Sequence, residues 1–207
     1  VLRAGRPLRY SNPMEIARRL LIVPRWGGHP ASDFYPWLLE RLRAAQPGTF
    51  TEARGLALPR PELPDVVAWP AAINEALGQD PAQLANTYVL AHSVGCQALL
   101  RSLASLPDGV KLGGALCVAG WWQIDQPWDT IRPWLDPLPQ LARVRAAMNK
   151  LTVLLSDNDP FTADHGANRQ MWEQRLGADV RLAPGGRHFN ASEEPAVLAA
   201  LLSLGLP

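Results

Sequence analysis

The residue types that are scarce in this sequence exclude several classes of protein. Only two of the 207 residues are cysteine, which excludes a small scaffold held together by disulfides. Charged residues make up 19% of the chain and hydrophobic residues 47%, so the composition is not that of a disordered chain. Only Lys111 and Lys150 are lysine, and the other basic residues are arginines spread along the chain among 19 acids. Without a basic patch, we expect no nucleic-acid partner.

Long apolar runs are also missing near the start of the chain. Residues 20–24 form the longest strongly apolar run there. It is far shorter than the ~20 residues that span a bilayer, and it lacks the flanks of a signal peptide. Cys96 and Cys117 do not form a Cys-x-x-Cys pair, which favours a reducing compartment. We therefore expect a cytoplasmic protein with no membrane partner.

Histidine occurs only four times, so any mechanism that needs an imidazole must use one of these four residues. They are scattered, and the two cysteines are far apart in the sequence, so we expect no metal site. The glycines at residues 24–29 match neither a phosphate-binding loop nor the dinucleotide spacing, so we expect no cofactor. The four histidines are His29, His92, His165 and His188.

The length of the chain favours one domain with a sizeable core. Residues 1–13 are basic, lack apolar periodicity and end in a Ser-Asn-Pro turn signal. We expect them to form an extension outside the core, with Met14 as a candidate start and residues 14–207 as a single domain. The sequence does not determine an oligomeric state.

Short apolar runs alternate with longer helical patterns from about Arg18 onward, which is typical of a parallel sheet covered by helices on both faces. The expected strands are residues 20–23, 53–58, 87–91, 112–119, 151–156 and 179–182. The expected helices are residues 33–45, 66–77, 94–106, 138–149, 166–176 and 194–204. In such sheets the functional residues follow the carboxyl ends of the strands.

The third expected strand runs directly into a nucleophile elbow. Ser93 lies in a small-x-Ser-x-Gly pattern, with Ala91 two residues before it and Gly95 two residues after it. Small neighbours allow the sharp strand-to-helix turn that exposes the serine hydroxyl. The pattern therefore predicts Ser93 as a nucleophile, provided that a base and an orienting acid follow it in the chain.

Both partners are present on later loops. Asp157 and Asp159 follow the strand expected at residues 151–156, and His188 follows the last expected strand, in a Gly-Gly-Arg-His-Phe segment. The other histidines compete poorly because they precede the serine, adjoin it, or lie too close to the acid loop. We interpret His92 as a packing or hydrogen-bonding residue of the elbow. Spacing alone does not choose between the two aspartates.

An oxyanion hole needs two N–H donors aimed at the charge that develops on the substrate oxygen. The backbone N–H of Val94 is the first candidate. The second is the N–H of Arg25 or Trp26 in the loop after the first expected strand, and we favour Trp26.

Residues 120–139 interrupt the alternation, with four tryptophans and four prolines. This stretch is too irregular for a regular element. We interpret it as a lid or pocket wall, although the rings could equally cover the end of the sheet. The expected pocket residues, from this stretch and the two later loops, are Trp121, Trp122, Trp134, Phe161 and Phe189.

Five short segments together resemble the family of retinoblastoma-binding protein 9 and its small bacterial relatives, which are compact serine hydrolases of the α/β-hydrolase fold. They are residues 23–28 (Val-Pro-x-x-Gly-Gly), 92–95 (His-Ser-x-Gly), 132–134 (Arg-Pro-Trp), 157–161 (Asp-x-Asp-Pro-Phe) and 186–189 (Gly-x-His-Phe). The resemblance implies a mostly parallel sheet of about six strands with a minimal lid. It also implies that Ser93 is the nucleophile, His188 the general base and Asp159 the orienting acid.

The expected activity is hydrolysis of a small ester, thioester or amide through an acyl-enzyme on Ser93. The apolar surroundings favour an uncharged acyl or aromatic group, so the expected partner is a small-molecule acyl substrate. Two alternatives remain: a catalytically weak protein that keeps the fold and binds a protein partner, and an acyltransferase or lyase that uses the same residues.

Overall fold

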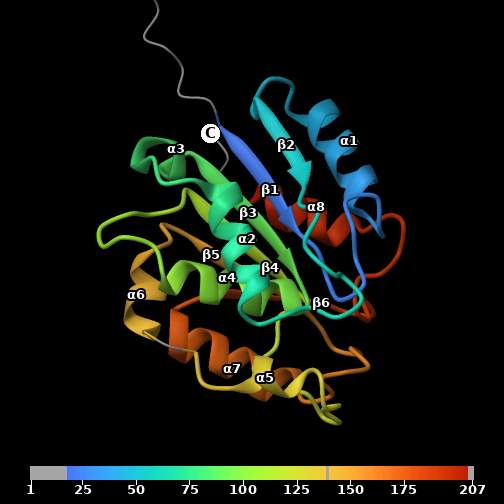
Figure 1. Cartoon of the computed structure of the whole chain (residues 1–207). Helices are drawn as coiled ribbons and strands as arrows, with labels where there is room; N and C mark the ends of the chain where they lie inside the picture. The colour runs from blue at the N-terminus through green and yellow to red at the C-terminus, as the bar shows by residue number, and fades with distance from the viewer. Residues whose placement is uncertain (1–17, 139, 205–207) are drawn as a thin grey trace, which may run out of the picture.

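The computed structural model describes residues 18–138 and 140–204. Within these ranges six parallel strands form one sheet in the order β2-β1-β3-β4-β5-β6. Helices α1 and α8 pack on one face of the sheet, and α2, α4, α6 and α7 pack on the other (Figure 1). The strands are β1 (Arg19–Val23), β2 (Glu52–Gly55), β3 (Thr87–His92), β4 (Gly114–Val118), β5 (Leu151–Ser156) and β6 (Asp179–Ala183).

Eight helices are formed by the described residues. Most of them connect one strand to the next, as parallel strands require. They are α1 (Tyr35–Ala45), α2 (Ala68–Leu77), α3 (Pro81–Ala85), α4 (Val94–Ala104), α5 (Arg132–Leu135), α6 (Leu141–Ala146), α7 (His165–Leu176) and α8 (Pro195–Leu202).

Residues of the central strands alternate between two cores, because successive side chains of a strand point to opposite faces. In β1, Leu21 and Val23 join the larger core, whereas Leu20 and Ile22 join the core beneath α1 and α8. All five residues of β1 are buried. This burial on both faces explains the continuous apolar runs that predict the strands.

The α/β class and the six strands predicted from the sequence are confirmed, with small shifts at the strand ends. Two helices were not predicted. Helix α3 begins at Pro81 after Asp80, whose side chain accepts the Ala82 N–H. Helix α5 lies inside residues 120–139, where we expected no regular element, so that expectation is wrong for four residues.

Among the residues that the structure describes, no helix is long and apolar enough to cross a membrane. The expected extension at residues 1–13 and the candidate start at Met14 lie outside the described residues. The assignment of residues 14–207 to a single domain stays a prediction.

Candidate active site

Ser93 occupies a strained turn between β3 and α4. Its backbone has a positive φ of 56°, which non-glycine residues rarely adopt. The helix begins one residue later, at Val94. A Cβ added to Gly95 would lie 2.6 Å from the Pro24 carbonyl oxygen and 2.8 Å from that of Val23, so this position accepts only glycine. The small-x-Ser-x-Gly pattern therefore has a direct steric cause here, the close approach of α4 to the loop after β1.

Three side chains from separate loops form a continuous hydrogen-bonded path. The distance from His188 Nε2 to Ser93 Oγ is 2.9 Å, and that from His188 Nδ1 to Asp159 Oδ2 is 2.8 Å. All three residues are buried, and only 7 or 8% of each is exposed. Ser93 follows β3, Asp159 follows β5 and His188 follows β6, so the carboxyl edge of the sheet brings them together.

The loops that carry the acid and the histidine are tied to each other by two further bonds. The Gly185 N–H donates to Asp157 Oδ1 at 2.8 Å, and the Arg187 N–H donates to Asn158 Oδ1 at 2.7 Å. Asp157 therefore contacts the backbone of the histidine loop and not the imidazole. Of the two aspartates that spacing left open, Asp159 is the one against His188.

The histidine loop is also held in an unusual backbone conformation. Arg187 and Phe189, on either side of His188, both have positive φ angles, of 50° and 54°. A Cβ added to Gly186 would meet the Phe189 ring at 2.8 Å, so glycine is needed for the ring to pack there. This tight turn fixes where the His188 ring stands.

Two backbone N–H groups beside Ser93 remain free to act as donors. Val94 is the first residue of α4, and the first N–H groups of a helix have no intrahelical partner. In the loop after β1, the Arg25 N–H donates to the Tyr35 hydroxyl at 3.1 Å. The Trp26 N–H has no acceptor among the described residues. Of the two candidates in this loop, Trp26 therefore keeps an available N–H.

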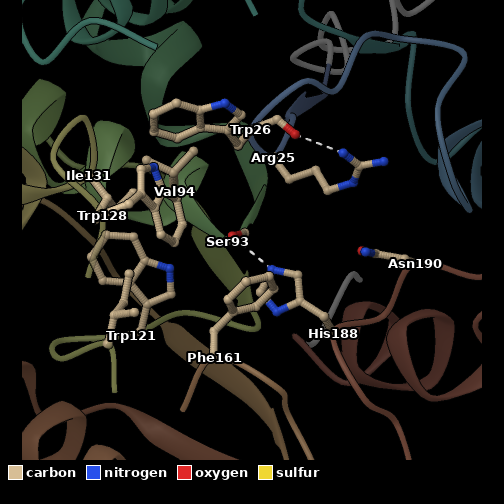
Figure 2. A pocket seen from close by; sticks show the side chains of 11 residues that line it. Arg25, Trp26, Ser93, Val94, Trp121, Trp128, Ile131, Phe161, His188 and Asn190 are labelled. Carbon is tan, nitrogen blue, oxygen red and sulfur yellow. Dashed lines mark hydrogen bonds between the residues drawn. The ribbon is translucent and has the colours of Figure 1, made fainter. Parts of the chain in front are cut away.

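A cavity of about 370 Å³ opens next to Ser93. Figure 2 shows Trp121, Trp128 and Ile131 on one side of Ser93, and His188 and Asn190 on the other. Trp128 packs edge-on against Trp26, with ring centroids 5.6 Å apart. The residues that line the cavity are Arg25, Trp26, Ser93, Val94, Trp121, Ile124, Trp128, Ile131, Phe161, His188 and Asn190.

Arg25 is the only lining residue whose side chain is ionised throughout the neutral pH range. Its Nε and one terminal nitrogen bind both carboxylate oxygens of Asp33, at 2.7 and 2.9 Å. This side-chain bond with Asp33 is the main cause that raises the pKa of Arg25. Because Asp33 offsets the charge, the cavity presents a wall that is apolar and close to neutral.

Only two of the five expected pocket residues, Trp121 and Phe161, line this cavity. Trp134 instead packs against Trp69, with centroids 6.3 Å apart, and Trp122 stacks under Arg175 at a separate hollow. Phe189 lies in the core beneath α1 and α8. The sequence could not separate these rings because the irregular backbone of residues 120–139 has no period from which a facing direction can be read.

The cavity residues that we did not expect are Ile124, Trp128, Ile131 and Asn190. Asn190 had a signal in the sequence, because it lies two residues after His188 on the same loop. Trp128 was visible as one of four clustered tryptophans. The two isoleucines carried no signal of their own.

The described residues contain no group of three metal-ligating side chains. Cys96 and Cys117 are both free and buried. Burial raises the pKa of the Cys96 thiol well above its usual range, so this cysteine is a poor nucleophile although it adjoins the elbow.

Comparison with known proteins places the chain among hydrolases of this fold. A family model described as serine hydrolase matches residues 20–197. The YdeN protein of Bacillus subtilis (strain 168) is 31% identical over 106 residues, which are 51% of this chain and 52% of that protein. The alignment with this curated relative thus spans about half of its length.

Solved structures support the fold over nearly the whole chain. The crystal structure of the ydeN gene product from B. subtilis has a TM-score of 0.76 at 22% identity, and covers 91% of this chain and 98% of that one. A carboxylesterase structure from Nitrososphaera gargenis has a TM-score of 0.63 at 10% identity, covering 90% and 89%. At these identities the likeness concerns the fold, which is that of the α/β-hydrolases.

Proposed function

The chain belongs to the serine hydrolase family, and from this we propose that it cleaves a small ester, thioester or amide through an acyl-enzyme on Ser93. The observation that carries the proposal is the path from Asp159 through His188 to Ser93, with distances of 2.8 and 2.9 Å. This path ends at a serine hydroxyl that lines an apolar cavity. Each group of this path is within hydrogen-bond reach of the next, which supports the roles of nucleophile, base and orienting acid for Ser93, His188 and Asp159.

In the first half of the reaction, Ser93 Oγ bonds to the substrate carbonyl carbon while its proton moves to His188 Nε2. Asp159 stays ionised and accepts a hydrogen bond from the Nδ1–H of His188, which holds the ring and stabilises its cation. The tetrahedral intermediate then breaks its bond to the leaving group, which takes the proton from Nε2. In the second half, water gives a proton to His188 and attacks the acyl carbon, and Ser93 Oγ leaves with that proton.

The negative charge on the substrate oxygen requires N–H donors. We assign this role to the backbone N–H groups of Val94 and Trp26. The start of helix α4 adds the positive end of its dipole at the same place.

The cavity supports a substrate with an uncharged acyl or aryl group. The side of Ser93 that carries Trp121, Trp128 and Ile131 would hold the apolar group, since burial of apolar surface favours binding there. Asn190, on the opposite side, would face the leaving group.

Within the family, the five short segments described above favour kinship with retinoblastoma-binding protein 9. We further propose the cytoplasm as the compartment, in keeping with two free cysteines.

Covalent labelling by a fluorophosphonate probe tests this function. We expect the wild-type chain to be labelled and Ser93→Ala to be unlabelled, because only an activated serine attacks the probe. Hydrolysis of p-nitrophenyl esters of increasing acyl length should be lost in the same variant. An unlabelled wild type, or equal labelling of Ser93→Ala, would show that the proposal is wrong.

A further inference from the structure

Two buried side chains outside the Ser93, His188 and Asp159 path connect the loops of the site. Tyr35 is the first residue of α1 and His92 is the last residue of β3, directly before Ser93, and neither has any exposed surface. The Tyr35 hydroxyl lies 2.9 Å from His92 Nδ1. On its other side, the same hydroxyl accepts the Arg25 N–H at 3.1 Å. His92 Nε2 lies 2.8 Å from the backbone carbonyl oxygen of His188.

The chemistry of the two ends fixes the direction of every hydrogen bond in this chain. The Arg25 N–H can only donate, so the Tyr35 oxygen accepts it and keeps its own proton for His92 Nδ1. The His188 carbonyl can only accept, so His92 Nε2 must carry a proton. A neutral His92 protonated on Nε2 satisfies all four groups at once. A protonated Nδ1 would leave the Tyr35 proton without its partner.

Burial also keeps His92 neutral. Removal from water lowers the pKa of His92 well below its usual range, and the nearby His188 lowers it further. The two imidazole rings lie 5.5 Å apart between centroids. A neutral ring at position 92 leaves the adjacent base without a competing cation.

The two ends of this chain of hydrogen bonds lie on loops with different tasks in the proposed reaction. Arg25 directly precedes Trp26, and its carbonyl accepts the Gly28 N–H at 2.9 Å. The planar peptide that joins Arg25 to Trp26 carries the Trp26 N–H. It is held on one side by the bond to the Arg25 carbonyl and on the other by the bond from the Arg25 N–H to Tyr35. At the far end, the His92 bond holds the main chain of the residue that supplies the imidazole.

We propose that Tyr35 and His92 are positioning residues that set the distance between the Trp26 oxyanion donor and the His188 base on either side of Ser93. This inference rests on the proposed function. It goes beyond that function because neither residue touches the substrate or belongs to the Ser93, His188 and Asp159 path. The transition state needs the base and the oxyanion donor together, so loosening their spacing affects turnover more than binding.

The test replaces Tyr35 by phenylalanine, which removes one oxygen and keeps the ring. Ser102→Ala is the matched control for stability, because it also removes a buried hydroxyl. This hydroxyl donates to Asn74 Oδ1 at a distance of 2.6 Å, and the pair lies outside the site. Tyr88→Phe, on the same strand as His92, is the control for the loss of a tyrosine hydroxyl as such. We expect Tyr35→Phe to lower kcat about 10- to 100-fold with KM within about threefold of wild type, as displacements of catalytic groups do. Both controls should keep the wild-type kcat.

A second pair of variants separates the hydrogen bond from simple packing. His92→Gln keeps an amide N–H that can reach the His188 carbonyl, whereas His92→Leu fills the space without a donor. We expect His92→Gln to retain at least about ten times the kcat of His92→Leu. Equal kcat in these two variants, or equal kcat in Tyr35→Phe and Ser102→Ala, would overturn the positioning role.

Amide hydrogen exchange gives a readout that needs no turnover. The Arg25 N–H should exchange faster in Tyr35→Phe than in Ser102→Ala, because its acceptor is gone. Unchanged exchange at Arg25 would contradict the inference even where the enzyme is active. By contrast, absence of fluorophosphonate labelling in the wild type would contradict the proposed function itself, so the two failures are distinguishable.

Discussion

At the scale of single residues, the two neighbouring aspartates after β5 have different contacts. Asp159 places one carboxylate oxygen on His188 and accepts the Phe161 N–H with the other, at 2.9 Å. Asp157 accepts a backbone N–H of the histidine loop. The first contact orients a ring whose protonation changes in the proposed reaction. The second joins two loops.

We predict that Asp159→Asn lowers kcat/KM by about 10⁴-fold, which is the size of the loss in kcat when a triad aspartate becomes an amide. An amide N–H facing Nδ1 favours the tautomer with its proton on Nε2, which cannot accept the proton of Ser93. Ester hydrolysis at neutral pH measures the effect.

The matched variant is Asp157→Asn, which keeps an oxygen that can accept the Gly185 N–H. Its loss of kcat/KM should be far smaller than that of Asp159→Asn. Similar losses in both variants would contradict the different roles assigned to the two carboxylates.

At the scale of elements, residues 120–136 form a pocket wall that is anchored to two helices. Gln97 of α4 donates to the Trp121 carbonyl. Asn168 of α7 donates to the Gly120 carbonyl at 2.9 Å and accepts the Trp122 N–H at 3.2 Å. These bonds fix the backbone on both sides of Trp121. They hold this part of the pocket wall in place although its backbone forms no helix or strand.

Trp128 differs from the other tryptophans of this wall in its exposure to solvent. The residue is 40% exposed, and its ring packs against those of Trp26 and Phe161 with centroid distances of 5.6 and 6.2 Å. Trp121 and Trp134, by contrast, are almost fully buried. The ring of Trp128 therefore limits the cavity at its solvent side.

We predict that Trp128→Ala shifts acyl preference toward longer chains. Removal of the ring opens the apolar end of the cavity, so the ratio of kcat/KM for a p-nitrophenyl ester of a long acid to that for the acetate should rise about tenfold, the discrimination that an apolar contact supplies. A series of p-nitrophenyl esters measures this ratio.

Trp37→Ala, on α1 and outside the cavity, serves as the control and should leave the ratio unchanged. If the ratio in Trp128→Ala equals that of the wild type, the Trp128 ring does not limit the length of the acyl group.

At the scale of the whole molecule, the buried His92 links stability to pH. Burial, and then the neighbouring His188, lower the pKa of His92 in the folded chain. The groups that face it are Tyr35 and His188, with Arg25 as a nearby cation. In the unfolded chain a histidine takes up its proton at about pH 6.5. Below that pH the unfolded chain binds more protons, so the folded chain loses relative stability.

We predict that the free energy of unfolding falls as pH drops below about 6.5, with a contribution from His92 that approaches about 1.4 kcal/mol per pH unit. Urea unfolding between pH 7 and pH 5 measures the slope. His92→Gln, which cannot titrate, should show a shallower slope than wild type. Identical slopes would mean that His92 is not the group responsible.

Much of the architecture follows from short-range sequence patterns. The four central strands β1, β3, β4 and β5 are predicted because they are buried on both faces and are therefore almost continuously apolar. The edge strands β2 and β6 are partly exposed and carry a weaker signal. Helices α3 and α5 were missed because they have only five and four residues, too few for an amphipathic period. Trp122 and Trp134 do not line the cavity beside Ser93, and the sequence could not show this because the direction of a ring on irregular backbone depends on what packs against it.

The sequence by itself determined the fold class, the elbow at Ser93 and the candidacy of His188, because strand burial, a strained turn and chain order leave local marks. The family resemblance favoured Asp159 as the acid, and the tertiary structure brings this residue against His188. Only the tertiary structure decided which N–H after β1 remains free and which aromatic rings surround the cavity. It alone joined Tyr35 to His92. The reason is that these relations are distances between segments far apart in the chain, set by packing across the carboxyl edge of the sheet.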